Sequence, residues 1–354
     1  MKDKIITFTF IGCLFFFAIF QFILPDKEIS ASERRKLTTF PEVELTSEYI
    51  TKVDKYLLDH FPFRDDFRSL KANFNYKILN KLDNNDIYLK DNYIFKSEYP
   101  TNEKNIAKFK EVITKIESLL TEKNKTYMML IPDKNYYLEE KNFLQLDYDY
   151  IYNEIGKLGI SEIDIRDIME LNDYYETDTH WKQERIEKVV KKMSEVMDFD
   201  YEVQEYTENK YDKFYGVYYG ESAINRKPEV LTYLTNDTIN NVTVKYLENK
   251  KLTTIYNLEK LKGLDGYEVY LDGASSFIEI ENKNSKSNKE LIIFRDSFGS
   301  SLTPLLVNYY QKITVVDNRY INSGMFKDMI EFKDQDILFL YSTLIVNNSG
   351  SLKG

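Results

Sequence analysis

Cysteine, histidine and tryptophan are almost absent from this chain of 354 residues, which has one cysteine, two histidines and one tryptophan. The single cysteine, Cys13, excludes an intrachain disulfide framework and a cysteine cluster for a metal ion. The fold must therefore rest on its hydrophobic core. A chain of this length with 43% hydrophobic residues is able to build a large one.

An excess of positive charge is also missing. The chain has 48 basic and 58 acidic side chains and a formal net charge of −10. Binding to nucleic acid relies on a basic surface that neutralises phosphates, so this composition argues against it. The sequence also contains neither a repeat of fixed period nor a glycine-rich phosphate loop.

One long hydrophobic run lies near the start of the chain. Ile5 to Leu24 are 20 residues without a charge, and at about 1.5 Å per residue they match the roughly 30 Å hydrocarbon layer of a bilayer. The run is a transmembrane helix or a signal sequence. Pro25 and three charged residues follow it instead of small residues, which favours an uncleaved anchor.

Charge does not fix the orientation of this anchor, because basic residues stand on both sides of it: Lys2 and Lys4 before, and Lys27, Arg34, Arg35 and Lys36 after. A very short tail before the anchor and a long domain after it are typical of a single-pass protein of the cell membrane. We therefore expect the carboxy-terminal domain to be extracytoplasmic.

The chain divides into three predicted parts: the anchor at 1–25, a connector with a juxtamembrane helix at 26–85, and an α/β domain at 86–354. In the juxtamembrane helix Ile50, Val53, Leu57 and Phe61 recur at helical spacing, which predicts one buried stripe that ends near Pro62. His60, beside this stripe, is best explained as a helix-end or core histidine.

Strands and helices alternate along most of the third part. Residues 87–95 suggest a hairpin, buried strands are expected at 126–132, 160–165, 290–294, 312–316 and 336–342, and helices are expected at 106–120, 186–197, 301–310 and 325–332. This alternation predicts a three-layer α/β/α fold with a mainly parallel sheet. Strand signals at 241–247, 252–256, 267–272 and 277–280 predict a strand-rich, antiparallel insertion around 201–280.

Two short motifs carry candidate chemistry. In TDTHW, Asp178 stands two residues before His180, where a carboxylate can orient a histidine that exchanges protons near neutral pH. In ELIIFRDSFG, Ser297 follows a predicted buried strand and precedes a predicted helix. This position exposes Ser297 at the edge of a parallel sheet, beside a helix amino terminus with unpaired N–H groups. A serine hydroxyl needs such a base to become a nucleophile.

Each motif also has a plainer explanation. Asp178, Thr179 or the residues of RDSFGSS can cap helices, and Trp181 can fill the core. An Asp-x-His pair can also ligate zinc, but no third ligand is apparent, so neither a metal nor another cofactor is predicted.

Together the motifs resemble a known family. Asp-x-His-Trp followed by Asp-Ser-Phe is similar to the SGNH-hydrolase-like proteins of alginate O-acetylation, and more closely to the membrane-anchored DHHW family of Gram-positive bacteria. Looser similarities extend over most of the chain, in SASERRKLTTFPE, YLLDHFPFRDDFRSLK, DNYIFK, MLIPDKNYY and FYGVYYGES.

The resemblance implies Ser297 as the nucleophile, His180 as the base and Asp178 as its orienting group. Arg295 stands where the family commonly has glycine, and a cation there either crowds the turn or binds an anionic substrate or intermediate. Gly216 permits close approach of a substrate or simply forms a turn. With Trp181, these two residues are the candidate substrate contacts.

The resemblance further implies an O-acetyltransferase or esterase that acts on a cell-envelope polysaccharide beside a membrane-bound O-acyltransferase. The alternative is a non-catalytic protein that binds glycan or scaffolds the cell envelope. Tyrosines suited to stacking on sugars would serve it: Tyr136, Tyr137, Tyr148, Tyr150 and Tyr152. These tyrosines are equally well explained as core and rim residues.

Overall fold

The computed structural model describes residues 2–30, 32–33, 35–138 and 143–353. Two residues of the predicted connector, Ala31 and Arg34, lie outside this part. The chain forms two compact units, one of residues 1–87 with 219–226 and one of residues 88–218 with 227–354.

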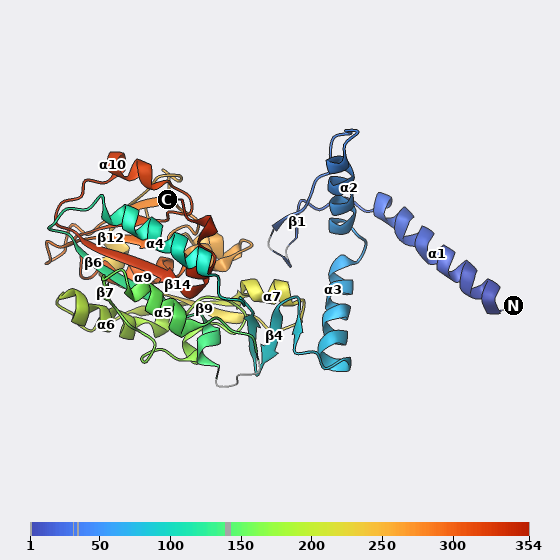
Figure 1. Cartoon of the computed structure of the whole chain (residues 1–354), viewed down its shortest axis with the longest axis horizontal. Helices are drawn as coiled ribbons and strands as arrows, with labels where there is room; N and C mark the ends of the chain where they lie inside the picture. Colours follow the sequence, from blue (N-terminus) through green and yellow to red (C-terminus); the bar gives the residue numbers. More distant parts are fainter. Residues whose placement is uncertain (1, 31, 34, 139–142, 354) are drawn as a thin grey trace. The chain divides into compact units, whose positions relative to one another are not determined.

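The first unit is mainly helical (Figure 1). Within the described residues, α1 is the one helix long and apolar enough to cross a membrane by length and composition. The unit contains α1 (Lys2–Ile23), β1 (Ile29–Ser30), β2 (Arg35–Lys36), α2 (Ser47–Asp59), α3 (Arg64–Asn73), a π-helical continuation η1 (Phe74–Ile78) and β3 (Asp83–Asn84). The Thr46 hydroxyl accepts a hydrogen bond from the Tyr49 N–H and so caps the start of α2.

The buried stripe predicted for the juxtamembrane helix is wrong. Ile50 is 70% exposed and Phe61 is 37% exposed, while Val53 and Leu57 are only half-buried. Helical spacing correctly predicted α2, but periodicity reports which residues share a face and not what covers that face. The apolar side of this unit is largely open.

The second unit contains a seven-stranded sheet in the order β10-β11-β13-β12-β14-β6-β7. The strands β12, β13, β14, β6 and β7 run parallel, and β10 and β11 join the edge antiparallel. Their bounds are β6 (Lys125–Ile131), β7 (Ser161–Glu162), β10 (Thr243–Tyr246), β11 (Phe277–Glu281), β12 (Glu290–Arg295), β13 (Lys312–Val316) and β14 (Asp336–Ser342). The predicted mainly parallel sheet is confirmed.

Alternate residues of the central strands enter two separate cores. In β12, Leu291 and Ile293 face one core while Ile292 and Phe294 face the other. Because successive side chains of a strand point to opposite faces, a strand that is apolar at every position requires cover on both sides. The sheet is therefore the middle layer of three.

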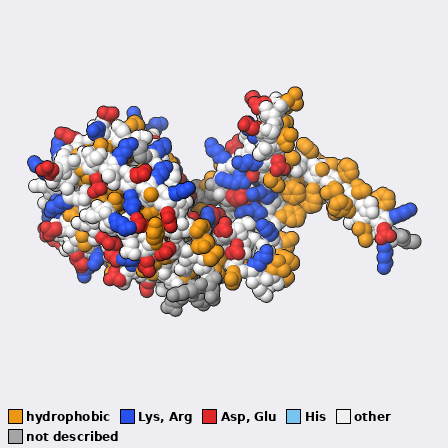
Figure 2. All heavy atoms as spheres, viewed as in Figure 1, with side chains coloured by type: hydrophobic (Ala, Val, Ile, Leu, Met, Phe, Trp, Pro, Cys, Tyr) orange, Lys and Arg blue, Asp and Glu red, His pale blue; other side chains and the backbone are white. Residues whose placement is uncertain are grey.

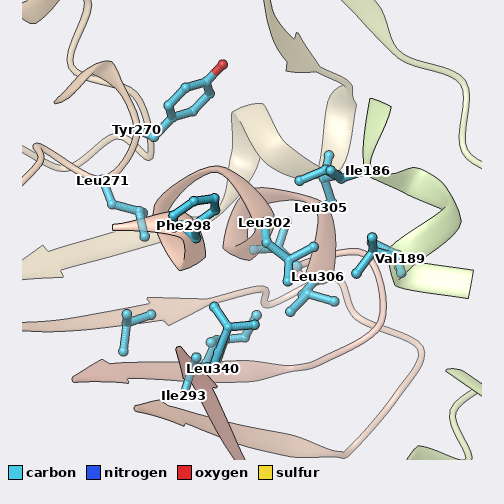
Figure 3. Close-up of a cluster of buried hydrophobic side chains, with 14 of the residues drawn as sticks. Ile186, Val189, Tyr270, Leu271, Ile293, Phe298, Leu302, Leu305, Leu306 and Leu340 are labelled. Atoms are coloured by element: carbon cyan, nitrogen blue, oxygen red, sulfur yellow. The ribbon is translucent and has the colours of Figure 1, made fainter. Parts of the chain in front are cut away.

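Helices supply the two outer layers. One core takes side chains from α6 (Glu187–Met197) and α9 (Phe298–Leu306), and the other from α4 (Glu103–Glu117), α5 (Tyr148–Gly156), α10 (Phe326–Met329) and α11 (Thr343–Asn347). Figure 3 shows Leu302, Leu305 and Leu306 of α9 between the sheet and the α6 region. This packing fixes the helix that follows Ser297 and confirms the predicted α/β/α fold class.

Smaller elements connect these layers. Strands β4 (Ile87–Lys90) and β5 (Tyr93–Lys96) are neighbours, as the predicted hairpin requires. The remainder are β8 (Thr207–Phe214), β9 (Glu229–Thr235), α7 (Val217–Ser222), α8 (Asp237–Asn241) and the 3₁₀ helices η2 (Lys134–Tyr137), η3 (Leu171–Asp173), η4 (Gln183–Arg185), η5 (Leu258–Lys262), η6 (Gly266–Val269), η7 (Ser323–Met325) and η8 (Ser349–Ser351).

Two strands predicted inside 201–280 are wrong. Residues 252–256 and 267–272 share only an isolated bridge between Tyr256 and Tyr270. Leu271 and Asp272 have φ values of 53° and 55°, a left-handed conformation that ends an extended run. The strand predicted at 160–165 is shortened to the two residues of β7. Burial in the core produced the apolar pattern that suggested strands.

Candidate active site

Ser297 lies at the point where β12 ends and α9 begins. Its neighbours in both directions are buried, but Ser297 itself is half-exposed at the carboxyl edge of the parallel strands. The Ser297 side chain does not cap α9. Its hydroxyl is therefore directed away from the helix amides and is available to another partner.

Asp296 supplies the cap instead. Its Oδ1 accepts from the Phe298 N–H at 3.0 Å, and its Oδ2 accepts from the Ser342 N–H at the end of β14 at 2.7 Å. The capping explanation of RDSFGSS therefore applies to Asp296 and not to Ser297. The turn from Arg295 to Phe298, which contains Ser297, is here called the serine turn. The buried Asp296 carboxylate connects it to the neighbouring parallel strand β14.

The helix amides near the serine are already engaged. Besides the Phe298 N–H, the N–H of Gly299 donates to the Asp296 carbonyl and the N–H of Ser300 donates to the Ser297 carbonyl, both at 3.1 Å. The expectation that this helix start offers unpaired N–H groups is wrong for these three amides, because the tight turn uses them itself.

The structure brings Asp178, His180 and Ser297 into one hydrogen-bonded chain. His180 Nε2 lies 2.7 Å from Ser297 Oγ, and His180 Nδ1 lies 2.6 Å from Asp178 Oδ1. A carboxylate only accepts, so Nδ1–H donates to Asp178 and Nε2 is left to accept the serine proton. This tautomer is the one that a general base for Ser297 requires.

Asp178 is held in its charged form although it is almost fully buried. Burial by itself would raise the pKa of Asp178, but the electrostatic interaction with His180 and hydrogen bonds from the His180 side chain and from the N–H groups of Val217 and His180 outweigh it. Together they hold the pKa well below its usual range. The group is therefore an acceptor at every physiological pH.

Aromatic side chains hold the His180 ring in place. The Tyr267 ring stacks on it with 3.9 Å between centroids and 6° between planes, and the Phe298 ring lies 4.9 Å away. The Tyr267 hydroxyl donates to Ser301 Oγ at 2.7 Å, and Trp181 Nε1 donates to the same oxygen at 2.8 Å. Helix α9 thus begins directly after Ser297 and also fixes the neighbours of His180.

Lys134 and Glu229 contact the segment from Tyr174 to Trp181, here called the histidine loop, from opposite sides. The Lys134 ammonium donates to the carbonyls of Tyr175 and Glu176 at 3.1 Å and of Asp178 at 2.8 Å. The Glu229 carboxylate accepts from the N–H groups of Glu176 and Thr177, each at 2.7 Å, and from the Thr177 hydroxyl.

Two consecutive peptide groups are therefore held at both ends. In each, the carbonyl oxygen accepts from Lys134 and the N–H donates to Glu229, so a positive and a negative charge complement the peptide dipole. Burial lowers the pKa of Lys134 to about 7, while the carboxylates of Glu229 and Asp178 oppose that shift. Three accepting carbonyls require all three N–H donors of the ammonium form.

Gly216 lies against the same loop. A Cβ on Gly216 would stand 2.1 Å from the Thr177 carbonyl oxygen and 2.3 Å from the Asp178 nitrogen. The Gly216 N–H also donates to the Thr177 hydroxyl at 2.9 Å. The close backbone approach expected of this glycine exists, and the group that it approaches is the histidine loop.

Arg295 and Trp181, the other candidate substrate contacts, are both fully buried. Arg295 pairs with Asp317 at 3.4 Å and also donates to the Gly273 carbonyl at 3.3 Å. Trp181 packs edge-on against Phe298. Both side chains support the serine turn from the interior side.

His60 belongs to the first unit. Its Nε2 lies 2.9 Å from the Thr38 carbonyl oxygen, and its ring packs on Tyr56. Within the described residues there is no group of three or more histidine, cysteine, aspartate or glutamate side chains placed to hold a metal ion.

Sequence reasoning missed Lys134, Glu229 and Tyr267. The segment MLIPDKNYY, which contains Lys134, was noted only for its similarity to the DHHW family. A lysine directly after a buried strand, at the edge of the sheet where Ser297 also lies, is a usable signal for Lys134. Glu229 and Tyr267 come from parts of the chain whose contacts depend on tertiary packing.

Comparison with family models and with curated proteins found no match. Comparison with solved structures found a DHHW family protein from Eubacterium siraeum, which is 18% identical, with a TM-score of 0.64 over 77% of this chain and 97% of that chain. Bacillus cereus PatB1, in a structure with a sulfonyl adduct, is also 18% identical, with a TM-score of 0.58 over 73% of this chain and 97% of that chain. These likenesses confirm the fold that the resemblance predicted.

A more distant likeness is the O-acetyltransferase domain of Pseudomonas putida AlgJ, which is 13% identical, with a TM-score of 0.45 over 74% of this chain and 92% of that chain. A score at this level is too low to argue from.

Proposed function

We propose that this protein is a membrane-anchored O-acetyltransferase or acetylesterase of the SGNH-hydrolase type that acts on a cell-envelope polysaccharide. The observation that carries the proposal is the continuous contact from Asp178 through His180 to the Ser297 hydroxyl, at 2.6 and 2.7 Å. Such a chain of acceptor, base and nucleophile serves acyl transfer through a covalent intermediate.

In the first step, His180 Nε2 takes the Ser297 proton as Oγ attacks the carbonyl carbon of an acetyl ester. The ester bond to the donor then breaks, and His180 returns the proton to the departing oxygen. Asp178 stabilises the imidazolium that exists between these two events. The result is an acetyl group bonded to Ser297 and a donor released as an alcohol.

In the second step, a hydroxyl group attacks the acetyl-serine. His180 removes the proton of that hydroxyl, the bond to Ser297 Oγ breaks, and the proton returns to Oγ. A sugar hydroxyl as attacker gives transfer, and water gives hydrolysis. Exposure of Ser297 at the sheet edge suits a large polymeric acceptor better than an enclosed cavity would.

We further propose that α1 anchors the protein in the cell membrane and that the second unit is extracytoplasmic. The support is a helix of 22 residues with an apolar composition. A single helix provides no path for an acyl group across a bilayer. The resemblance to the alginate O-acetylation and DHHW proteins suggests a membrane-bound O-acyltransferase as the partner that delivers the acetyl group, and the single anchor fits such a partnership.

The test is acetyl-enzyme formation. The full chain in detergent is treated with a small activated acetyl ester, and mass spectrometry of the intact protein and its peptides locates the adduct. We expect one acetyl group on Ser297, absent from Ser297→Ala and from His180→Ala but retained by Ser300→Ala, a serine of the helix that follows Ser297. A folded wild-type protein without adduct or turnover would instead support a glycan-binding or scaffolding role.

A second arm separates transfer from hydrolysis. The acetylated protein is mixed with de-acetylated envelope polysaccharide, and loss of the adduct is compared with that in buffer. Acetate on the sugar identifies a transferase, and free acetate alone identifies an esterase.

A further inference from the structure

The first unit exposes a row of large apolar side chains on α3 and η1. Their exposed fractions lie between 43% and 65%, and the row consists of Phe63, Phe67, Leu70, Phe74 and Ile78. Residues three or four apart lie on one side of a helix, so the row is a continuous stripe, here called the aromatic ridge. An apolar surface of this extent normally marks an interaction site.

The aromatic ridge continues from the proposed anchor. The ring of Phe17 in α1 lies 5.7 Å from that of Phe67, and Phe20 lies 6.2 Å from Phe63. Phe17 also stacks on Phe61, at 5.3 Å. In Figure 2 the hydrophobic side chains of α1 continue onto the neighbouring helices of this unit. Whatever surrounds this end of α1 therefore also reaches the ridge.

The opposite side of α3 is occupied by its own unit. Ala72 and Asn75 are buried, and the guanidinium groups of Arg64 and Arg68 pair with the Glu33 carboxylate at 2.7 and 3.7 Å. These two arginines are thus neutralised within the protein, whereas Lys71 of α3 and Lys77 of η1 are exposed. An anionic surface would gain little from the arginines, while an apolar one fits the open side of the helix.

The start of the ridge is strained. Phe63 has φ 58° and ψ 28°, a left-handed conformation that is costly for a bulky residue and is easy for glycine. Strained conformations of this kind persist only where the surrounding structure holds them, and they cluster at functional sites. Here the strain presents an aromatic ring, 50% exposed, beside the end of α1.

We propose that the aromatic ridge lies in the interfacial layer of the lipid bilayer, parallel to its surface, and so fixes the first unit against the membrane at the foot of the anchor. Amphipathic helices with aromatic faces bind at this depth without crossing the membrane. The inference rests on the proposed anchoring through α1. The ridge itself binds through apolar contact, so binding does not require charged lipid, although the exposed Lys71 and Lys77 can add attraction to anionic headgroups.

The test measures the depth of single labels in the full chain. Cys13→Ser provides a cysteine-free background, and an environment-sensitive fluorophore is attached through Leu70→Cys, Phe10→Cys or Asp65→Cys. Asp65 lies on the other side of α3 with 54% of its side chain exposed, so it is the matched control for Leu70. The protein is placed in neutral phosphatidylcholine vesicles, with or without lipids that carry a quencher in the acyl chain.

We expect blue-shifted emission and lipid quenching at positions 10 and 70, but not at 65, and the same result in high salt. Quenching at 10 with water-like emission at 70 would overturn the inference while leaving the anchor intact. Shielded emission at 70 without lipid quenching would overturn it in favour of cover by a protein surface. Water-like emission at 10 would contradict the anchor itself, independently of the Ser297 chemistry.

Discussion

The two segments that form the candidate site are held in different ways. The serine turn continues a buried strand into a buried helix, so its position follows from the apolar layers of the fold. The histidine loop forms neither a strand nor a helix. Tyr175 and Trp181 anchor it in the core, and its backbone between them is held by polar contacts from three other places in the chain: Lys134, Glu229 and Gly216. A local pattern is enough to place the first segment, whereas the second depends on distant buried charges.

Because of this difference, we expect substitutions that loosen the histidine loop to reduce catalysis more than comparable substitutions around the serine turn. The largest effect is expected at Asp178. In Asp178→Asn the side chain no longer guarantees an acceptor for Nδ1–H, and the wrong tautomer of His180 becomes accessible. We expect kcat to fall by about 10³ to 10⁴-fold with the fold intact, as for the equivalent group of other triads. Steady-state acetyl transfer checks this, and a loss below tenfold would exclude Asp178 as the orienting group.

Gly216→Ala should have the next largest effect. The new Cβ would require the Thr177 carbonyl to move, because 2.1 Å is far inside contact distance. A displacement of about 1 Å at catalytic groups costs on the order of 10²-fold in rate. The matched control is Gly159→Ala, where a Cβ would have no atom within 4 Å, although the positive φ of Gly159 adds some strain. Equal activities of the two variants would contradict the role assigned to this close approach.

Lys134→Met removes three donors from the loop while keeping a long, unbranched side chain. We expect kcat to fall by about 10 to 10²-fold with little change in KM, because Lys134 positions His180 without touching substrate. Lys188→Met is the control, since Lys188 makes a partly exposed ion pair with Asp173 nearby, and it should change kcat less than twofold. A rise in KM alone would place Lys134 in substrate binding.

Asp296→Asn tests how strongly the serine turn depends on a polar contact, in comparison with the histidine loop. An asparagine oxygen can still accept one of the two amide hydrogen bonds, and β12 and α9 hold the turn through their own packing. We expect a loss of activity below about tenfold, smaller than that of Lys134→Met. The reverse order would show that the serine turn is the less well supported segment.

The last prediction concerns stability instead of activity and is a pH dependence. The pKa of Lys134 is about 7 in the folded chain and about 10.4 once unfolded, so between these values the unfolded chain binds more protons. The free energy of unfolding then rises with pH, by at most about 1.4 kcal/mol per unit. The advantage of wild type over Lys134→Met in denaturant unfolding should therefore grow from pH 7 to pH 10. A constant difference would contradict the lowered pKa.

The fold class was accessible from sequence because its signals are local. Asp178, His180 and Ser297 were singled out through the resemblance to the DHHW family, since each motif by itself also has a plainer explanation. Alternating apolar strands predicted the layers, and a serine directly after one of them predicted an edge position. The supports of the histidine loop were not accessible in this way. Glu229 lies 52 residues from Thr177 in the sequence, and nothing in EVLTYLT indicates that its carboxylate is turned toward another loop.

The spacing of apolar residues led to wrong predictions in two places. Ile255 and Tyr270 are buried in the core without forming strands, so burial produced a strand-like sequence in irregular structure. In the first unit, Ile50 and Phe61 have the spacing of a buried face but are exposed. A membrane is one environment in which such a face would be covered, and sequence periodicity does not distinguish it from a protein core.

The most direct test of the account is the rate at which a sulfonyl fluoride labels Ser297, measured at one pH in wild type, Lys134→Met and His180→Ala. Loss of fluoride and formation of the oxygen–sulfur bond require removal of the Ser297 proton, which is the task assigned to His180. The account predicts the fastest labelling in wild type, slower labelling in Lys134→Met and the slowest in His180→Ala, with the adduct on Ser297. Labelling of His180→Ala at the wild-type rate would contradict it.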